Sequence, residues 1–378
     1  MTSDVLIIGG GVIGLSLARE LRRRGIREIT IVDRGPVGRE ASWAAAGMLA
    51  PNIETDMTEE FHLFGCQSLE LYPAFADALY DETGIDIELD RTGTLCIALS
   101  DAEIAALDEA YFRQKERNVR VQYLSAAEVL ELEPAISGAV VGGLLYPNDW
   151  QVDNRKLVEG LHAFADRNDV KVIENAEITD LMTDGHRLTG AKIGDDDIAA
   201  GVTVIATGAW TSLIKIAGAT LAVDVRPIRG QMISYEAPAG LLCHVVYGAD
   251  GYLVPRYDGR ILVGATVEDA GFEKVTTEAG VRALGSAAAA MAPVIAGYPI
   301  KEAWSGLRPF APDGMPVLGR IPDYENLFVA SAHYRNGILL APKTAQIMAD
   351  IMIEDLESPF LTSFGAERFV QTADAIRY

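Results

Sequence analysis

The stretch that most constrains the fold is residues 5–33, VLIIGGGVIGLSLARELRRRGIREITIVD. An apolar run, Val5–Ile8, predicts a buried parallel strand, and glycines follow it in G-x-G-x-x-G order. The next residues have the apolar spacing of a helix, and a second apolar run, Ile29–Val32, ends in Asp33. This order of strand, glycine turn, helix, strand and acid is typical of a dinucleotide-binding βαβ unit.

Each part of this stretch has a physical role in such a unit. Gly9 makes the tight turn, Gly11 lets the backbone approach a pyrophosphate, and Gly14 lets helix and strand pack closely. The helix N-terminus directs unpaired N–H groups at the phosphates. Asp33 is placed to accept hydrogen bonds from ribose hydroxyls. The alternative is a glycine-rich turn that binds nothing.

Composition narrows the class of protein. The 378 residues suggest two domains or one two-lobed unit, and the net charge of -22 argues against a nucleic-acid partner, which needs a basic surface. Cys66, Cys96 and Cys243 form no C-x-x-C or other metal pattern and are odd in number. We therefore expect no metal site, a reducing compartment and three buried cysteines with the role of small apolar residues.

The chain shows no signal-peptide pattern at its start, which favours a cytoplasmic location. One uncharged stretch, Ala283–Ile300, is long enough to raise the question of a membrane span. It is rich in alanine and contains two prolines, so we expect a helix that ends near Met291 and a turn after it, with no membrane span.

The remaining pattern mixes helices with strands. Further helices are predicted over residues 57–81, 101–117, 125–131, 154–166 and 277–291, and strands over 170–173, 202–205, 222–227, 230–236, 244–247, 251–255, 260–265 and 327–330. We expect Pro73 to kink or break the first of these helices. Residues 85–99 are expected to form two strands around a turn, and the last long helix is expected to begin at about Pro342.

Several motifs together resemble the D-amino-acid-oxidase-like flavoprotein family, in particular its glycine oxidase branch from thiamine biosynthesis. The resemblance extends from about Asp4 to Asp350. The motifs are Ile7–Gly14 with Asp33, Ser42–Pro51 (SWAAAGMLAP), Gly251–Arg256 (GYLVPR), Gly264–Val267 (GATV), Trp304–Pro309 (WSGLRP) with Asp313-Gly314, and His333–Pro342 (HYRNGILLAP).

The resemblance implies an α/β fold with an α+β second lobe, in which a Rossmann-like FAD-binding domain is interleaved with an antiparallel-sheet substrate domain. The FAD-binding domain is expected to comprise residues 1–82, 142–219 and 320–364, the substrate domain 83–141 and 220–319, and a C-terminal tail 365–378. No cysteine lies near Leu307–Phe310, where some relatives attach FAD, so we expect non-covalent FAD.

The residues expected to bind FAD come from four parts of the chain. They are Gly9, Gly11, Val12, Ile13, Gly14, Asp33, Arg34, Ala41, Ser42, Ala46, Gly47, Met48, Ile178, Thr207, Gly208, Asn336, Gly337, Ile338 and Leu339. The backbone N–H groups before the last helix, at residues 337–340, are expected to stabilise negative charge on the reduced flavin.

Three residues are candidates for the substrate site. By resemblance, Arg308 binds the substrate carboxylate, for which a guanidinium fork has matching geometry, and Tyr252 adds a hydroxyl. Arg335 either helps to hold the substrate or lies above the flavin, and the alternative is a phosphate or structural pairing. Val267 either lines the pocket or belongs to the core, and His333 is expected to be a packing group.

The family oxidises the Cα–N bond of amino acids. The expected reaction is oxidation of glycine or another small amino acid, such as a D-amino acid or sarcosine, by hydride transfer to FAD and then dioxygen, giving a 2-oxo acid, ammonia and hydrogen peroxide. The alternatives are a D-amino-acid dehydrogenase with a quinone or protein acceptor, or a non-catalytic flavin subunit of an oxidase complex. The resembled branch also contains tetramers, so a homo-oligomer is expected.

Overall fold

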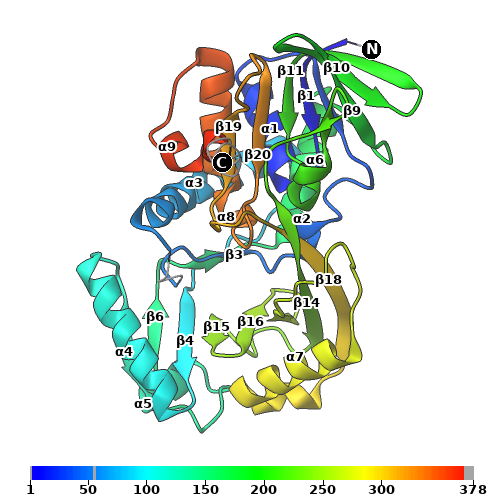
Figure 1. Cartoon of the computed structure of the whole chain (residues 1–378). Helices are drawn as coiled ribbons and strands as arrows, with labels where there is room; N and C mark the ends of the chain where they lie inside the picture. The colour runs from blue at the N-terminus through cyan, green and yellow to red at the C-terminus, as the bar shows by residue number, and fades with distance from the viewer. Residues whose placement is uncertain (1, 54–56, 370–378) are drawn as a thin grey trace, which may run out of the picture.

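A computed structural model describes residues 2–53 and 57–369, and these form two lobes, each built on one sheet (Figure 1). Among the described residues, ten strands make the first sheet. They are β1 (Thr2–Ile8), β2 (Ile29–Val32), β8 (Lys171–Ile173), β9 (Ile178–Asp184), β10 (Arg187–Ile193), β11 (Asp196–Ile205), β12 (Lys215–Ile216), β13 (Ala219–Thr220), β19 (Val317–Arg320) and β20 (Leu327–Ser331). The centre of this sheet is parallel: β1 pairs with β2 and β11, and β11 pairs with β20.

Helices cover one face of the first sheet. The helices that meet there are α1 (Val12–Arg23), α3 (Glu59–Thr83), α6 (Asn154–Arg167) and α8 (Gly337–Ala349). Side chains such as Ile7, Leu15 and Phe64 are completely buried between them and the sheet. The β9–β10 hairpin contributes Leu181 and Leu188 to a second apolar cluster, which also contains Leu6 of β1. Apolar residues therefore cover the parallel strands on both faces, as their continuous apolar sequence predicts.

The second sheet forms the lower half of the molecule in Figure 1. Its eight strands, counted over the same described residues, are β18 (Ile300–Phe310), β14 (Arg226–Glu236), β17 (Arg260–Gly264), β16 (Gly251–Pro255), β15 (Val245–Gly248), β4 (Thr94–Ala98), β6 (Gly142–Tyr146) and β5 (Gln122–Ser125), in spatial order. Most neighbouring pairs are antiparallel, but β15 and β4 are parallel. The accompanying helices are α4 (Asp101–Glu116), α5 (Ala126–Leu132) and α7 (Glu278–Met291).

Short elements complete the described chain. They are α2 (Ala41–Ala44), β3 (Met48–Leu49), β7 (Trp150–Gln151), the 3₁₀ helices η1 (Gly208–Leu213) and η2 (Pro293–Gly297), the π-helical turn η3 (Asp350–Glu354) and α9 (Leu361–Phe364). The expected fold class, a Rossmann-like domain with a separate antiparallel-rich sheet, is confirmed. The domain boundaries stay a proposal. Because β6 belongs to the second sheet, we propose moving the boundary at residue 142 to follow Tyr146.

Several secondary-structure predictions were wrong. The helix around Pro73 is not broken, since α3 continues to Thr83 with one side buried. Of the two strands expected in residues 85–99, only β4 forms. The first is absent, and Glu88, within its expected range, has a positive φ, which does not fit an extended strand. The two strands expected between residues 222 and 236 are one strand, β14. It passes through Pro227, which lies opposite Pro309, so neither position has an N–H to leave unpaired.

The last long helix begins at Gly337, five residues earlier than predicted, and contains Pro342. A proline has no N–H, so the carbonyl of Ile338 loses its partner within the helix. The buried hydroxyl of Tyr72 in α3 donates to that carbonyl instead. The hydroxyl of Ser68 donates to the Leu339 carbonyl at 2.6 Å. Side chains of α3 thus compensate for the proline, and this compensation cannot be seen in the local sequence.

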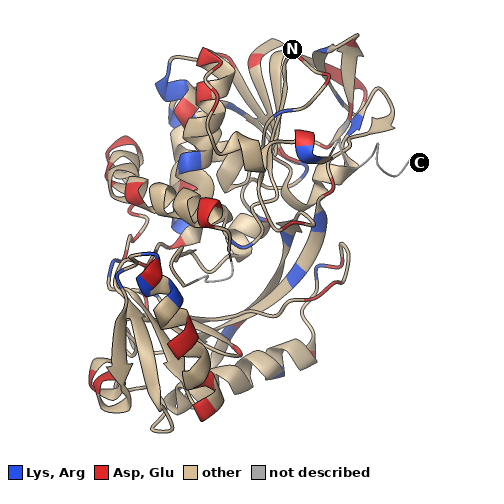
Figure 2. Cartoon of the chain, turned by 60° about the vertical axis from the view of Figure 1, so that its left-hand side comes forward, with Lys and Arg blue, Asp and Glu red and all other residues tan. Residues whose placement is uncertain are grey.

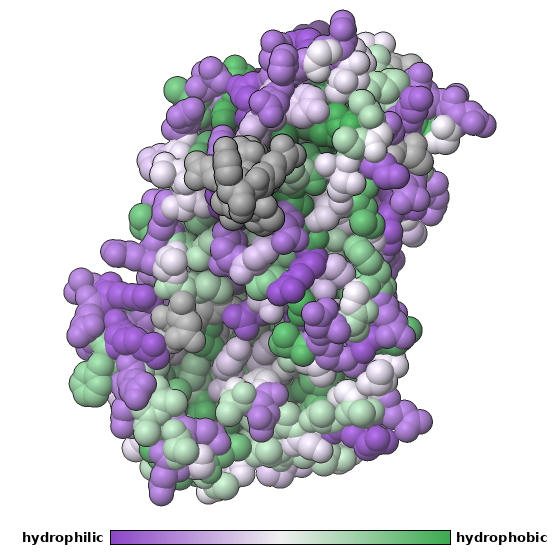
Figure 3. All heavy atoms as spheres, in the orientation of Figure 1, coloured by the Kyte–Doolittle hydropathy of each residue, from purple (hydrophilic) through white to green (hydrophobic). Residues whose placement is uncertain are grey.

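Surface features separate into three observations. None of the described helices is both long enough and apolar enough to cross a membrane. Acidic and basic residues occur on both lobes (Figure 2), and hydrophilic residues cover the outer parts of the face shown in Figure 3. The expectation of three buried cysteines was wrong: Cys96 is buried, Cys66 is half-buried and Cys243 is exposed.

We expect Tyr72→Phe to lower the free energy of unfolding by about 1–3 kcal/mol, because it leaves the buried Ile338 carbonyl without a donor. Urea denaturation would measure this loss. The control is Tyr80→Phe, which removes a hydroxyl from an exposed tyrosine on the same helix. Equal stability of the two variants would contradict this role of Tyr72.

Candidate active site

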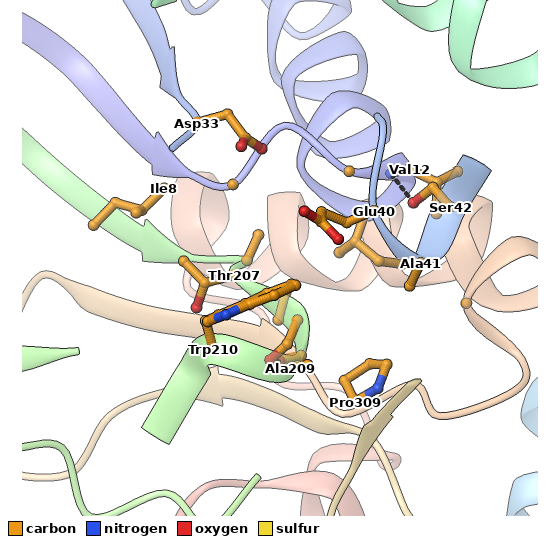
Figure 4. A pocket seen from close by; sticks show the side chains of 18 of the residues that line it. Ile8, Val12, Asp33, Glu40, Ala41, Ser42, Thr207, Ala209, Trp210 and Pro309 are labelled. Carbon is orange, nitrogen blue, oxygen red and sulfur yellow. Dashed lines mark hydrogen bonds between the residues drawn. The ribbon is translucent and has the colours of Figure 1, made fainter. Parts of the chain in front are cut away.

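A pocket opens at the carboxyl ends of β1, β2 and β11 (Figure 4). We call it the first pocket. Gly9 follows β1 with a φ of +111°, and a Cβ there would overlap the Ala206 carbonyl after β11. A Cβ on Gly14 would overlap the Gly9 carbonyl. The glycines therefore permit the tight turn and the close start of α1 that a dinucleotide site needs.

The start of α1 faces this pocket without an acidic residue in its first turn. The N–H of Val12 donates to the hydroxyl of Ser42 at 2.9 Å, which Figure 4 shows as a dashed line. The first N–H groups of a helix have no acceptor within it, and with the helix dipole they attract an anion. This end of the pocket is therefore suited to a pyrophosphate.

Asp33 lies at the end of β2 and lines the same pocket. Its Oδ2 accepts from the Gly10 N–H at 2.7 Å, and its Oδ1 accepts from the Gly35 N–H at 2.9 Å. Burial raises the pKa of Asp33, while these two backbone hydrogen bonds oppose the rise. The bonds fix the carboxylate at the pocket wall, and each oxygen retains a second lone pair for a ribose hydroxyl.

Most residues expected to bind FAD line one of the two pockets. Those in the first pocket are Gly9, Gly11, Val12, Ile13, Asp33, Arg34, Ala41, Ser42, Ile178, Thr207, Gly208, Gly337 and Ile338. Those in the adjoining second pocket are Ala41, Ala46, Gly47, Met48, Asn336 and Ile338. Gly14 and Leu339 line neither; Gly14 serves the turn, and the Leu339 side chain is buried in the apolar core of the first lobe.

Some residues of the first pocket were not foreseen. Trp210 lines its wall, and the Arg34 guanidinium lies 3.8 Å from the centre of a Trp210 ring. Phe272, from the loop after β17, packs its ring against Trp210, with the ring centres 5.8 Å apart. In the same loop Lys274 forms a 2.7 Å ion pair with Glu40, another lining residue. The second lobe therefore contributes to the rim of the first pocket, which only the folded chain reveals.

The second pocket lies beside the first and contains the candidate substrate residues Arg308, Tyr252 and Arg335. The two pockets share five residues, so they form one continuous site. The shared residues are Ala41, Ala45, Tyr334, Arg335 and Ile338. The sequence prediction that these side chains converge rested on resemblance, and the structure brings them to one cavity.

Arg308 is half-buried on β18, and its Nη1 donates to the carbonyls of Thr266 at 3.0 Å and Arg229 at 3.3 Å. Burial raises the pKa of the Tyr252 phenol, while the positive charges of Arg308 and Arg335 and a side-chain hydrogen bond with Arg308 oppose the rise. The phenol is therefore a neutral donor next to a cation. Such a pair suits a carboxylate.

Three further residues line the second pocket. Val267 lines it and is 62% exposed, so it is not a core residue. Tyr247, which the sequence did not single out, also lines it and stacks on Tyr252 with ring centres 5.9 Å apart. Arg335 lies over the ring of Tyr334, with its guanidinium carbon 5.5 Å from the ring centre.

The short segment Ala41–Met48 separates the pockets and is held by side chains from both lobes. Asn154 of α6 donates to the Ser42 and Trp43 carbonyls at 2.8 and 3.1 Å. Trp304 of β18 donates to the Ala44 carbonyl at 3.0 Å. Arg256 donates to the Ala46 carbonyl at 2.6 Å.

Arg256 is the charged residue among these anchors, and it is buried. It also donates to Gln151 at 2.8 Å, and burial lowers its pKa to about 10, which leaves it charged at neutral pH. Its guanidinium thus joins the segment to the second sheet and to the residues that precede α6. Among the described residues no cluster of three His, Cys, Asp or Glu is arranged to hold a metal.

The comparisons with known proteins agree with this geometry. A family model described as FAD dependent oxidoreductase matches residues 4–351. The glycine oxidase of Geobacillus kaustophilus is 37% identical over 374 residues, which are 97% of this chain and 97% of that protein. The chain belongs to this FAD-dependent oxidoreductase family. Relatives that the chain covers over nearly their whole length are named glycine oxidases.

Other relatives extend the comparison. The crystal structure of the Geobacillus kaustophilus enzyme matches with a TM-score of 0.90 at 36% identity, covering 97% of this chain and 98% of that one. The bifunctional protein ThiO/ThiG of Trichormus variabilis is 36% identical over 99% of this chain. The chain spans only 56% of that relative. An L-proline dehydrogenase from P. horikoshii matches with a TM-score of 0.85 at 20% identity, covering 98% of each chain, which shows the shared fold alone.

We expect Arg256→Met to weaken FAD binding by about tenfold or more, because small displacements of a positioning segment have effects of this size. Fluorescence titration of the apoprotein with FAD measures the affinity. Arg256 and Arg260 both form ion pairs with Asp153, at 3.9 and 3.0 Å. The matched control is therefore Arg260→Gln, which removes one partner of Asp153 but no hydrogen bond to the segment Ala41–Met48. Equal FAD affinity of the two variants would show that Arg256 does not hold the segment.

His333 is a buried pocket residue whose Nε2 lies 3.0 Å from the Thr344 hydroxyl. Burial lowers its pKa to about 3, whereas the unfolded chain has a histidine pKa near 6.5. Between these values the unfolded state binds the extra proton. His333 therefore costs stability as the pH falls below about 6.5, by up to about 1.4 kcal/mol per pH unit.

Denaturation of wild type and His333→Asn at pH 7.5 and 5.5 tests this sign. The stability advantage of the wild type is expected to shrink at the lower pH. His186→Asn, at an exposed histidine, is the control. An advantage that stays constant or grows on acidification would contradict the buried neutral state of His333.

Proposed function

We propose that the enzyme oxidises glycine or another small amino acid, including small D-amino acids and secondary amines such as sarcosine. The observation that carries this proposal is the pairing of Arg308 with Tyr252 in a pocket continuous with the first one. The guanidinium fork and the neutral phenol would bind the substrate carboxylate. We call these two side chains the carboxylate clamp.

The lining of the second pocket supports a small amino-acid substrate. Apolar side chains in this lining include Met48, Met232 and Ala265, and the ring of Tyr247 stacks on Tyr252. A carboxylate fixed at the clamp leaves the substrate Cα toward the residues shared with the first pocket, such as Ala45 and Ile338. The clamp thus orients the Cα–H, and the apolar wall keeps water from the reacting carbon.

The residues of the first pocket fit FAD. Gly9 and the start of α1 are suited to its pyrophosphate, Asp33 to its ribose, and the segment Ala41–Met48 with Ile338 to its ring. None of the three cysteines lines either pocket, which supports non-covalent binding. FAD, when bound, supplies the chemistry of accepting a hydride from Cα and passing two electrons to dioxygen.

The overall reaction balances with one dioxygen and one water for each amino acid. The substrate loses two electrons and two protons to become a 2-imino acid, and dioxygen takes them up as hydrogen peroxide. Water then replaces the imine nitrogen to give ammonia and the 2-oxo acid, which is glyoxylate for glycine. The protein needs no acid–base residue at Cα if the amine arrives neutral, and it contributes binding and orientation.

Other parts of the proposal rest on the relatives. The relatives named ThiO/ThiG support a role in thiamine biosynthesis, in which the imine of glycine would be used for thiazole synthesis. A cytoplasmic location and a homotetrameric assembly remain proposals from the sequence.

The test is anaerobic reduction of the bound flavin by glycine, sarcosine, D-alanine, D-proline and L-alanine, followed by its absorbance near 450 nm, a general property of flavins. We expect glycine to bleach the wild type. In Arg308→Ala the half-saturating glycine concentration should rise by the equivalent of roughly 3–5 kcal/mol, because the substrate carboxylate loses its partner. Arg226→Ala, at an exposed arginine of β14, is the control.

Three outcomes would overturn parts of the proposal. Bleaching that persists unchanged in Arg308→Ala would remove Arg308 from the clamp. Bleaching without peroxide formation in air would favour a dehydrogenase. Absence of bleaching by any amino or imino acid would favour a non-catalytic flavin subunit.

A further inference from the structure

Two glycines lie directly opposite one another in the second sheet, at the wall of the second pocket. Gly230 of β14 pairs with Gly306 of β18, and both line the pocket. A Cβ on Gly306 would lie 2.5 Å from the Cβ of Ala44, in the segment between the pockets. A Cβ on Gly230 would overlap all three outer atoms of the Arg308 guanidinium. The missing side chains leave a depression in this face of the sheet, and Arg308 occupies part of it.

The strand register explains this contact. Arg308 pairs with Ile228, two residues from Gly230, so the Arg308 and Gly230 positions share one face of the sheet. The Arg308 side chain extends along that face until its guanidinium covers Gly230. There its Nη1 donates to the Thr266 and Arg229 carbonyls. The guanidinium is thus held between two backbone acceptors and the bare backbone of β14.

Gly230 does not need to be glycine for backbone reasons. It lies within the regular strand β14, and its φ is outside the left-handed region. An alanine would therefore fit the backbone, and only the Arg308 side chain stands in its way. The glycine is required for space over the strand, and not for a turn.

The other half of the clamp repeats the arrangement. Tyr252 of β16 lies directly opposite Gly264 of β17. A Cβ on Gly264 would overlap the phenol of Tyr252, including its hydroxyl. Each clamp side chain therefore lies flat over a glycine of the neighbouring strand. The same solution appears twice in one pocket, at positions far apart in the sequence.

We propose that Gly230 is a positioning residue for the carboxylate clamp, since it provides the space in which the Arg308 guanidinium lies while it faces the substrate. The inference rests on the proposed function, in which Arg308 binds the carboxylate. It adds that the required geometry depends on β14 as well as on the arginine. Any side chain at position 230 displaces the guanidinium from the Thr266 carbonyl and from the substrate.

Gly230→Ala in the FAD-loaded enzyme tests this proposal. The guanidinium is the end of a flexible side chain, so it moves aside and the sheet stays folded. We expect the dissociation constant of glycolate, the hydroxyl analogue of glycine, to rise on the order of 10- to 100-fold. Glycolate binding is followed by the change it causes in the flavin absorbance, which requires no turnover. The KM for glycine rises in parallel, while kcat changes less.

A double-mutant cycle separates positioning from general damage. If Gly230 acts through Arg308, Gly230→Ala has no further effect on glycolate binding in the Arg308→Ala background. Gly138→Ala, at an exposed glycine whose added Cβ would meet nothing within 4 Å, is the control. If Gly230→Ala alone fails to fold, the double variant must fold, because the overlapping guanidinium is gone. A double variant that also fails to fold overturns the proposal.

The outcomes also separate this inference from the proposed function. Weak glycolate binding in Arg308→Ala together with wild-type binding in Gly230→Ala overturns the positioning role and leaves the clamp intact. Additive effects of the two substitutions overturn the positioning role as well. A wild-type protein that binds no glycolate and is not reduced by glycine overturns both.

Discussion

The active site depends on the hydrogen bonds that hold the backbone of Ala41–Met48 between the two lobes. Asn154 binds this segment from the first lobe, and Arg256 and Trp304 bind it from the second. Each bond fixes the position of one backbone carbonyl of the segment. Because the segment lines both pockets, its position decides whether a cofactor in one and a substrate in the other can meet.

The opposite wall of the site is built in a different way. The first turn of α8 places Ile338 in both pockets, although Pro342 removes one of the helix hydrogen bonds. Tyr72 and Ser68 of α3 supply partners for the carbonyls near the proline. The wall is thus stabilised from outside the site, by side chains of α3. In both walls, side chains that are distant in sequence hold the backbone in place through hydrogen bonds to its carbonyls.

Much of the first lobe could be predicted from the sequence, because its signals are local. The strand, the glycines and Asp33 lie within 29 consecutive residues and were found where expected. The second lobe is different, since its strands pair over long distances. That Arg308 faces Tyr252 depends on the registers of β14 with β18 and of β16 with β17. The apolar periodicity of a strand does not give its register with a distant strand. The prediction that Arg308 and Tyr252 share a site therefore rested on the resemblance to a family.

The misses have identifiable causes. The two strands expected over residues 222–227 and 230–236 form the single strand β14, in which the missing N–H of Pro227 lies opposite Pro309. The late start assigned to α8 came from Pro342, which α3 compensates. The contacts of Lys274 and Phe272 with the rim of the first pocket link a loop of one lobe to the other lobe. In each case the residue that makes the deciding contact is distant in the sequence, and local sequence patterns do not predict such contacts.

We propose that a cofactor in the first pocket and a substrate carboxylate in the second pocket meet at the wall that the pockets share. The most direct measurement is a crystal structure of the FAD-loaded protein with glycolate. We expect the glycolate carboxylate between Arg308 and Tyr252, and the flavin ring against Ala45 and Ile338, next to the glycolate Cα. A carboxylate bound away from Arg308, or a flavin ring outside this shared wall, would contradict it.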